Sequence, residues 1–175
     1  KRATGHDLGL EKQIVLVTGG TRGVGAGICA VLADLGATPI ACGRTATATD
    51  AEADVAFVAC DVRDEDAVAA MIGGIVGTYG RLDGVVNNAG GSPFALAADA
   101  SSRFTGKIME LNLLAPLIVA RAAHAVMRTQ ETGGAIVNVS SVSGHRPSPG
   151  TSSYGAAKAG LDNLMTSLAI EWAPR

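Results

Sequence analysis

Aromatic residues are scarce in this sequence, at 3% of its 175 residues, whereas hydrophobic residues reach 47%. A buried core must therefore be built mainly from Ala, Val, Leu and Ile. A basic stripe is also missing: the formal net charge is −2 and the arginines are scattered, which argues against a nucleic-acid partner. Apolar runs end short of the ~18 residues that suggest a membrane span, and nothing resembles a signal peptide, so no membrane partner is expected.

Cysteine is nearly absent as well. Cys29, Cys42 and Cys60 show no Cys-x-x-Cys spacing, and we interpret them as small buried thiols in the reducing cytoplasm. Length and hydrophobic content predict one globular domain over residues 1–175. We expect no bound metal.

Apolar runs rich in β-branched residues alternate with segments of helical periodicity. The predicted strands are 13–18, 38–43, 55–60, 82–87 and 134–139, and the predicted helices are 23–35, 64–79, 104–129 and 152–173. This alternation predicts an α/β fold, a doubly wound parallel sheet of Rossmann type with helices on both faces.

The first predicted strand leads directly into Thr18-Gly19-Gly20-Thr21-Arg22-Gly23-Val24-Gly25, and an amphipathic helix follows. A strand, a glycine turn and a helix form the unit that holds the phosphates of a dinucleotide. Glycines allow close backbone approach, and the helix N-terminus offers free N–H groups. A tight glycine turn that binds no ligand is the alternative.

Tyr154 and Lys158 lie four residues apart in the last predicted helix, so they share one face. A lysine cation beside a phenol favours the phenolate and makes the phenol a better acid near neutral pH. By itself this motif is weak, because an ordinary tyrosine on a surface helix would give the same pattern.

The glycine motif and Tyr154-x-x-x-Lys158 occur in order with Asn87-Asn88-Ala89-Gly90, Asn112 and Ser141, which lies thirteen residues before Tyr154. This ordered set resembles the short-chain dehydrogenase/reductase family in its single-domain form, including members that reduce 3-oxoacyl thioesters. The resemblance implies four catalytic residues. Tyr154 protonates a carbonyl oxygen, Ser141 orients that oxygen, Lys158 also holds the nicotinamide ribose, and Asn112 supports a proton relay.

Pro116 gives a separate reason to single out Asn112. Proline has no N–H, so the helical hydrogen bond from position 116 to the carbonyl of Asn112 cannot form. The free carbonyl oxygen could hold a water molecule, which the family uses for its proton relay. An ordinary proline kink that solvent relieves is the alternative.

Charge favours NADP over NAD as the cofactor. An acidic residue about 20 positions after the glycines holds the ribose 2′-hydroxyl of NAD. Here Ala41-Cys42-Gly43-Arg44 ends the second strand with no acid. A guanidinium can instead bind a 2′-phosphate, and Arg22 offers a second cation.

The resemblance implies further cofactor contacts. Asp61 and Val62 would lie at the adenine, although Asp61 could instead cap the next helix, a task that Asp64 can perform equally well. Asn88, Ala89 and Gly90 would line the cofactor ribose, and Asn87 would brace neighbouring strands.

These motifs predict an NADP-dependent oxidoreductase that transfers hydride between nicotinamide and a carbonyl or secondary alcohol, with a small-molecule substrate. Reduction of 3-oxoacyl thioesters is the favoured reaction. An alcohol or steroid dehydrogenase, a lyase or epimerase of related fold, and a catalytically silent NADP-binding subunit remain as alternatives.

Two expectations concern the whole molecule. The helices predicted at 104–129 and 152–173 carry many small apolar residues, which predicts a homo-oligomer, a tetramer or a dimer. The sequence stops at Trp172-Ala173-Pro174-Arg175, whereas the family it resembles continues with two more strands and a substrate-covering segment. We therefore expect the C-terminal strands of the sheet to be missing, which would leave strand 134–139 at an exposed edge.

Overall fold

The computed structural model describes residues 8–45 and 55–173. Its strands form one parallel sheet in the order β3-β2-β1-β4-β5. The strands are β1 (Ile14–Thr18), β2 (Thr38–Gly43), β3 (Ala56–Ala59), β4 (Gly84–Asn87) and β5 (Ala135–Asn138). The helices are α1 (Gly23–Asp34), α2 (Glu65–Tyr79), α3 (Ser102–Met109), the π-helical turn η2 (Glu110–Leu114), α4 (Ala115–Met127), the 3₁₀ turn η3 (Val142–Gly144) and α5 (Ser152–Trp172). The predicted parallel α/β architecture is confirmed.

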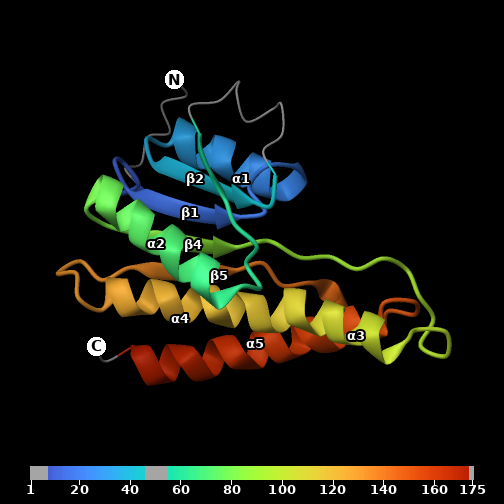
Figure 1. Cartoon of the computed structure of the whole chain (residues 1–175). Coiled ribbons are helices and arrows are strands. Elements are labelled where there is room, and N and C mark those ends of the chain that lie inside the picture. The colour runs from blue at the N-terminus through green and yellow to red at the C-terminus, as the bar shows by residue number, and fades with distance from the viewer. Residues whose placement is uncertain (1–7, 46–54, 174–175) are drawn as a thin grey trace.

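Two apolar clusters hold helices against opposite faces of the sheet (Figure 1). Alternate residues of the fully buried β1 point to the two faces. Val15 and Val17 pack with Cys29 of α1, whereas Ile14 and Leu16 join α2 and α4. All three cysteines are buried thiols, as predicted.

The helix predicted at 104–129 is divided by the π-helical turn η2, which the sequence pattern did not predict. The side-chain amide of Asn112 donates to the Ile108 carbonyl oxygen at 2.9 Å and so competes with the backbone ladder. Pro116 offers no N–H to that ladder. The Ala115 N–H reaches back five residues to the carbonyl of Glu110. A widened turn therefore lies between α3 and α4.

Taken together, α3, η2 and α4 (Ser102–Met127) are long and apolar enough to cross a membrane by length and composition alone. Their packing gives them another role. Val119 and Ala123 belong to the core against the sheet, and the polar Asn112 is fully buried. We therefore describe this stretch as a core helix.

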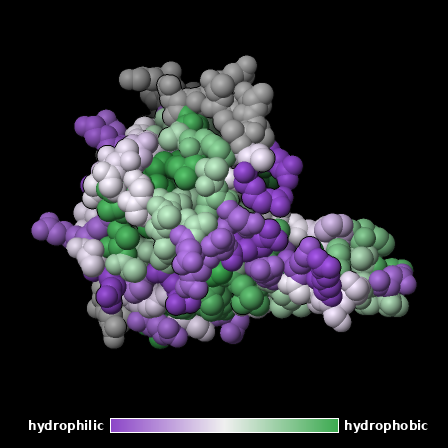
Figure 2. All heavy atoms as spheres, in the orientation of Figure 1, coloured by the Kyte–Doolittle hydropathy of each residue, from purple (hydrophilic) through white to green (hydrophobic). Residues whose placement is uncertain are grey.

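The carboxyl ends of all five parallel strands meet at one edge of the sheet, where ligands bind in such folds. The helix α5 reaches the same edge, because its N-terminal half contacts α3, η2 and η3. The loop 91–101 and α3 project beyond the sheet as an arm (Figure 1). Apolar surface lies on that arm (Figure 2), where Phe94 is 73% exposed.

Candidate active site

A cavity of about 680 Å³ opens along the carboxyl edge of the sheet. All of the residues predicted to bind the cofactor line it: Gly19, Thr21, Arg22, Gly23, Val24, Gly25, Arg44, Asp61, Val62, Asn88, Ala89, Gly90, Tyr154 and Lys158. Asn112 and Ser141, the other two predicted catalytic residues, lie outside this lining. The motifs that are scattered through the sequence are therefore brought to one continuous surface.

Several lining residues were missed by sequence reasoning. They are Cys42, Gly43, Thr45, Cys60, Arg63, Gly91, Leu111, Val139 and Ser140. Most belong to strand ends or to loops beside a predicted residue, so only their position after a strand could have indicated them. Arg63 is the exception, because a cation two residues after Asp61 is a visible sequence feature.

The charge of the lining is positive. The lining contains four cationic side chains, of Arg22, Arg44, Arg63 and Lys158, but among the described residues only one carboxylate, that of Asp61. A positively charged cleft favours a polyanionic ligand.

The backbone of the glycine loop packs closely against neighbouring protein atoms on the side away from the cavity, where no side chain would fit. A Cβ at Gly25 would fall well inside contact distance of the Gly19 carbonyl oxygen and 2.6 Å from Asn88 Nδ2. Gly19 itself has a φ of 64°, which a larger side chain rarely adopts. Because the helix α1 begins at Gly23, its N-terminus opens into the cavity.

Hydrogen bonds between neighbouring strand ends fix this loop. Thr18 Oγ1 accepts from the N–H groups of Asn88 and Ala89, both at 3.0 Å. The Asn88 side chain donates to the carbonyl oxygens of Thr18 and Gly19 at 3.0 and 3.2 Å. Asn87 instead links β4 to β5 through Asn138 at 2.8 Å, in agreement with the bracing role expected for it.

Tyr154 and Lys158 share a face of α5, as their spacing predicts. The Lys158 ammonium lies 5.8 Å from the centre of the Tyr154 ring. Lys158 is only 3% exposed, and its Nζ donates to the Val139 carbonyl oxygen at 2.7 Å. Burial lowers the pKa of Lys158, an effect that the nearby Asp162 carboxylate partly opposes.

The Asn112 side chain holds the loop beneath Lys158. Its Oδ1 accepts from the Gly91 N–H at 2.8 Å, and its Nδ2 donates to the Gly91 carbonyl oxygen at 3.0 Å. A Cβ at Gly90 would lie 2.7 Å from Asn112 Oδ1 and 3.7 Å from Lys158 Nζ, so both side chains converge on this glycine. The Asn112 side chain therefore ties the loop at Gly91 to the helical stretch at Ile108.

Two adjacent serines differ in their surroundings. Ser141 Oγ accepts from the Ser143 N–H at 3.2 Å and caps η3, which leaves its hydroxyl proton available for donation. Ser140 lines the cavity, and its buried Oγ has no hydrogen-bond partner within the described chain. Gly155 allows η3 to approach α5, because a Cβ there would lie 2.6 Å from the Ser143 carbonyl oxygen.

Asp61 is left to the cavity because Asp64 caps α2, with its Oδ1 accepting from the Ala67 N–H at 3.0 Å. Arg63 donates to both carboxylate oxygens of Asp61, at 2.9 Å from Nε and 2.5 Å from Nη2. These hydrogen bonds lower the pKa of Asp61 to about 2, and the Arg44 charge contributes to the shift.

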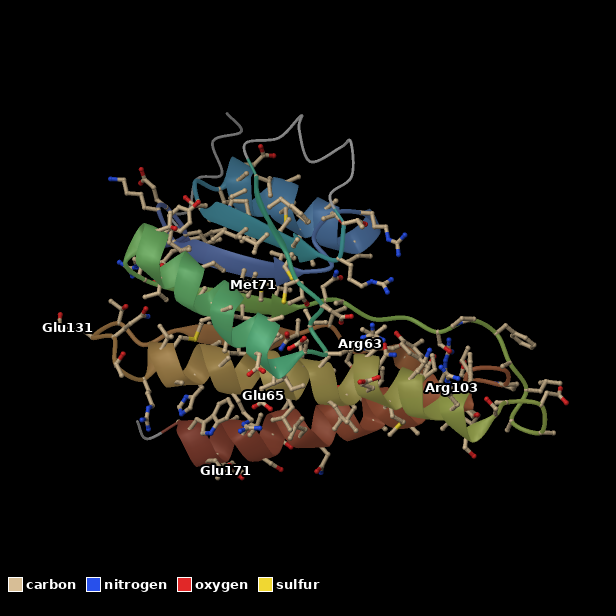
Figure 3. All side chains as sticks on the ribbon, in the orientation of Figure 1. Arg63, Glu65, Met71, Arg103, Glu131 and Glu171 are labelled. Atoms are coloured by element: carbon tan, nitrogen blue, oxygen red, sulfur yellow. The ribbon has the colours of Figure 1, made fainter. Side chains whose placement is uncertain are left out.

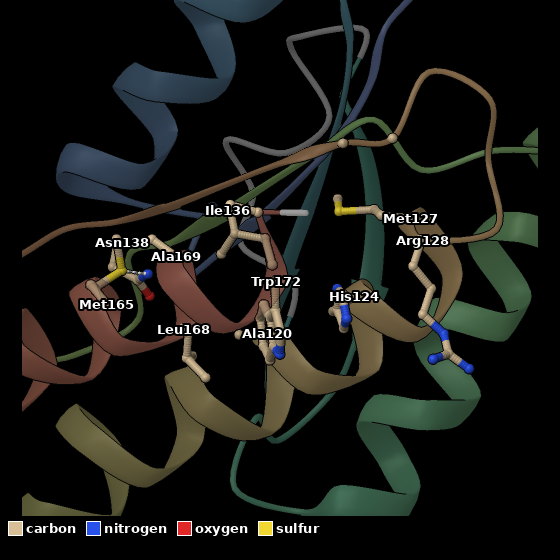
Figure 4. Close-up of a pocket in the computed structure, with 13 residues that line it drawn as sticks. Ala120, His124, Met127, Arg128, Ile136, Asn138, Met165, Leu168, Ala169 and Trp172 are labelled. Atoms are coloured by element: carbon tan, nitrogen blue, oxygen red, sulfur yellow. Dashed lines mark hydrogen bonds between the residues drawn. The ribbon is translucent and has the colours of Figure 1, made fainter. Parts of the chain in front are cut away.

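A second cavity, of about 320 Å³, lies between α4, β5 and α5 (Figure 4). Ile136, Met165 and Leu168 contribute to its mainly apolar lining. His124 and Trp172 stack at its wall with 4.1 Å between ring centres. None of the predicted site residues lies here.

The larger cavity fits a dinucleotide. It combines a glycine cradle that admits no Cβ at Gly25, a helix N-terminus and arginines at the ends of two strands. No group of three His, Cys, Asp or Glu side chains that could hold a metal occurs among residues 8–45 and 55–173. The fold and the cavity thus define a dinucleotide-binding α/β protein.

The chain belongs to the short-chain dehydrogenase family, whose model matches residues 13–175. A 3beta-hydroxysteroid dehydrogenase of Mediterraneibacter gnavus is 35% identical over 94% of this chain and 62% of its own length. A 3-oxoacyl-acyl-carrier-protein reductase of Chlamydia muridarum is 34% identical over 93% of this chain and 68% of its own length.

Solved structures agree with the family. A short chain dehydrogenase from Mycobacterium smegmatis has a TM-score of 0.90 and 32% identity, covering 99% of this chain and 76% of that one. The chain spans about two thirds of the length of these two curated relatives, 62% of one and 68% of the other.

Proposed function

We propose that the protein is an NADP-dependent oxidoreductase that transfers hydride between nicotinamide and a carbonyl or secondary alcohol. The observation that carries this proposal is the convergence of Tyr154 and Lys158 on the cavity that the glycine loop lines. A proton donor beside a dinucleotide site supplies the second half of a carbonyl reduction. When bound, the cofactor supplies the hydride.

Tyr154 is the proton donor in this proposal. Its hydroxyl gives a proton to the substrate oxygen, and the buried ammonium of Lys158 stabilises the phenolate that remains. Lys158 has three N–H donors, and one of them binds the Val139 carbonyl oxygen. The other two are available for ribose hydroxyls and for a water molecule. The Asn112 carbonyl completes the route by which that water returns a proton to the lysine.

Ser141 orients the substrate oxygen. Because its lone pair accepts from the Ser143 N–H, the hydroxyl is fixed with its proton directed elsewhere. A hydroxyl that donates to a carbonyl oxygen stabilises the negative charge that develops there during reduction.

NADP is the proposed cofactor because two cations, one in the glycine loop and one just after β2, line the cavity. Arg22 and Arg44 are both present there, and the end of β2 carries no acid. A 2′-phosphate can pair with these guanidinium groups, whereas a carboxylate in their place would repel it.

A 3-oxoacyl thioester is the proposed substrate class, in keeping with the Chlamydia relative. The hydroxysteroid dehydrogenase relative, of similar identity, favours oxidation or reduction of a sterol alcohol as the second candidate. In both substrate classes the reacting carbon is oxidised or reduced between a ketone and a secondary alcohol, and an apolar chain or ring system is attached to it.

The proposal has two further parts: the protein works in a reducing compartment such as the cytoplasm, and it forms a homo-oligomer. Buried thiols at Cys42 and Cys60 are compatible with reducing conditions. Small side chains on the outer face of α5, including Ala156 and Ala159, are exposed in the single chain and suit close helix packing between subunits.

A substrate panel tests the function. Ketones, steroid alcohols and 3-oxoacyl thioesters of graded length are offered with NADPH or NADP, and the nicotinamide absorbance is followed. Turnover of thioesters supports the first candidate, and turnover of steroids alone supports the second. Cofactor binding without turnover of any panel member would overturn both in favour of a silent NADP-binding subunit.

A further inference from the structure

Arg63 is a cation of the cavity lining to which the proposed function assigns no role. It follows β3 and precedes α2, above the helical stretch from α3 to α4 (Figure 3). It lines the cavity, and its side chain is 29% exposed. Its charge faces Asp61 and Glu110, and both raise its pKa, with the hydrogen bond to Asp61 as the main cause.

The bonds between Arg63 and Asp61 use most of what the carboxylate can accept. Oδ1 accepts from the Arg63 backbone N–H at 3.1 Å and from its Nε at 2.9 Å. Among the described residues, Oδ2 accepts only from Nη2 of Arg63, at 2.5 Å. Since each carboxylate oxygen has about two acceptor positions, Oδ1 is saturated and Oδ2 keeps one. The Asp61 side chain is 35% exposed, so that position is open to the cavity.

The strand order indicates which part of a dinucleotide lies at Asp61. The glycine loop after β1 receives the pyrophosphate. Arg44 at the end of β2 then lies beside the adenosine ribose, and Asp61 at the end of β3 lies one strand further out. The group beyond the ribose is the purine base, whose exocyclic amino group is a hydrogen-bond donor.

We propose that Arg63 is a positioning residue that makes the cofactor site selective for adenine. By holding Asp61 through three hydrogen bonds, it directs the one open acceptor position of Oδ2 toward the exocyclic amino group. In hypoxanthine a carbonyl oxygen replaces the amino group. Two hydrogen-bond acceptors, this oxygen and Asp61 Oδ2, would then face each other, and no hydrogen bond could form. Arg63 also neutralises a carboxylate that would otherwise repel the cofactor phosphates. This inference rests on the proposed dinucleotide function.

The experiment compares binding of NADP with binding of its hypoxanthine counterpart, by calorimetry and without substrate. The wild type should bind the adenine form at least about tenfold more tightly, the effect of one hydrogen bond to a charged group. In Arg63→Met the ratio should fall below about threefold, because the carboxylate is no longer oriented. Arg63→Lys keeps the positive charge but loses the planar guanidinium group. Compared with Arg63→Met, it should therefore bind both dinucleotides more tightly, while its preference for the adenine form stays below that of the wild type.

Arg121→Met is the matched control. Arg121 forms an exposed ion pair at 3.6 Å with Glu65, which closely follows Arg63 in the sequence, and neither partner lines the cavity. It should leave both affinities unchanged. An unaltered ratio in Arg63→Met, or equal binding of both bases by the wild type, would overturn the inference. Failure to bind either dinucleotide would instead overturn the proposed function itself.

Discussion

Arg44 shows how one side chain can set cofactor preference. It lines the cavity just after β2, and its charge contributes to the lowered pKa of Asp61, so its field reaches the adenosine end of the site. No carboxylate at the end of β2 competes for it. In the proposed function, Arg44 is the residue that favours NADP over NAD.

Arg44→Ala should weaken NADP binding by about 1.5–3 kcal/mol and NAD binding much less, because only NADP loses a charge-assisted contact. Calorimetric titration with both cofactors gives the comparison. Arg128→Ala, in the second cavity, is the control and should change neither. Equal losses of NAD and NADP binding in Arg44→Ala would show that this residue does not contact the 2′-phosphate.

Lys158 links the chemistry to stability. Burial lowers its pKa below the ordinary value of 10.5. Between the two values the unfolded chain holds a proton that the folded chain has lost, so the free energy of unfolding rises with pH in this window. The cost of burying the charge is present in full below the folded pKa.

The stability of wild type relative to Lys158→Met should therefore be greater at about pH 10 than at neutral pH. Urea unfolding of both proteins without cofactor gives the difference at each pH. A difference that stays constant, or that falls with rising pH, would mean that the lysine is not destabilised as a cation in the folded protein.

At the scale of elements, α1 and its glycine loop depend on a backbone approach that excludes a single methyl group. Gly25→Ala places a Cβ against Gly19 and Asn88. It should destabilise the fold by about 1–3 kcal/mol through overpacking and reduce cofactor affinity, because the loop must move to relieve the contact.

Gly27→Ala is the matched control on the same helix. A Cβ at Gly27 meets no atom within 4 Å, so the substitution should stabilise the helix by up to about 1 kcal/mol and leave cofactor binding unchanged. Thermal unfolding and calorimetry of both variants decide the matter. Identical behaviour of the two alanine variants would contradict the packing argument.

The elements that local pattern determines were predictable. Buried strands such as β1 show continuous apolar runs, and glycines mark the turn that follows. The π turn at η2 was not predictable, because it depends on the Asn112 amide bonding to Ile108 and to the loop at Gly91. Arg63 was visible in the sequence as a cation near Asp61, but the planar pairing of its side chain with that carboxylate was not, because it depends on the folded geometry.

At the scale of the whole molecule, α5 has two different faces. Ala157 and Leu161 are buried in the single chain, whereas Ala156, Ala159 and Ile170 are exposed. Some of the apolar residues of this helix that suggested an oligomer are thus buried within the single chain. The exposed remainder is what an oligomer could cover.

We expect the protein to sediment as a dimer or a tetramer of its 17.5 kDa chain. Ala159→Arg should dissociate it, because a charged side chain cannot be buried without a partner between closely packed helices. Light scattering across micromolar concentrations measures both proteins. A monomer mass for the wild type throughout that range would refute the expected assembly.

The central claim is that Tyr154 protonates a carbonyl while nicotinamide reduces it. The most direct test combines Tyr154→Phe with NADPH that carries deuterium at the transferred position. Wild type should place deuterium on the carbinol carbon of the product. Tyr154→Phe should bind NADPH nearly as well but lose about 10²–10⁴-fold in kcat, because only the proton donor is removed. A product without deuterium, or a variant that keeps more than about a tenth of wild-type kcat, would contradict the claim.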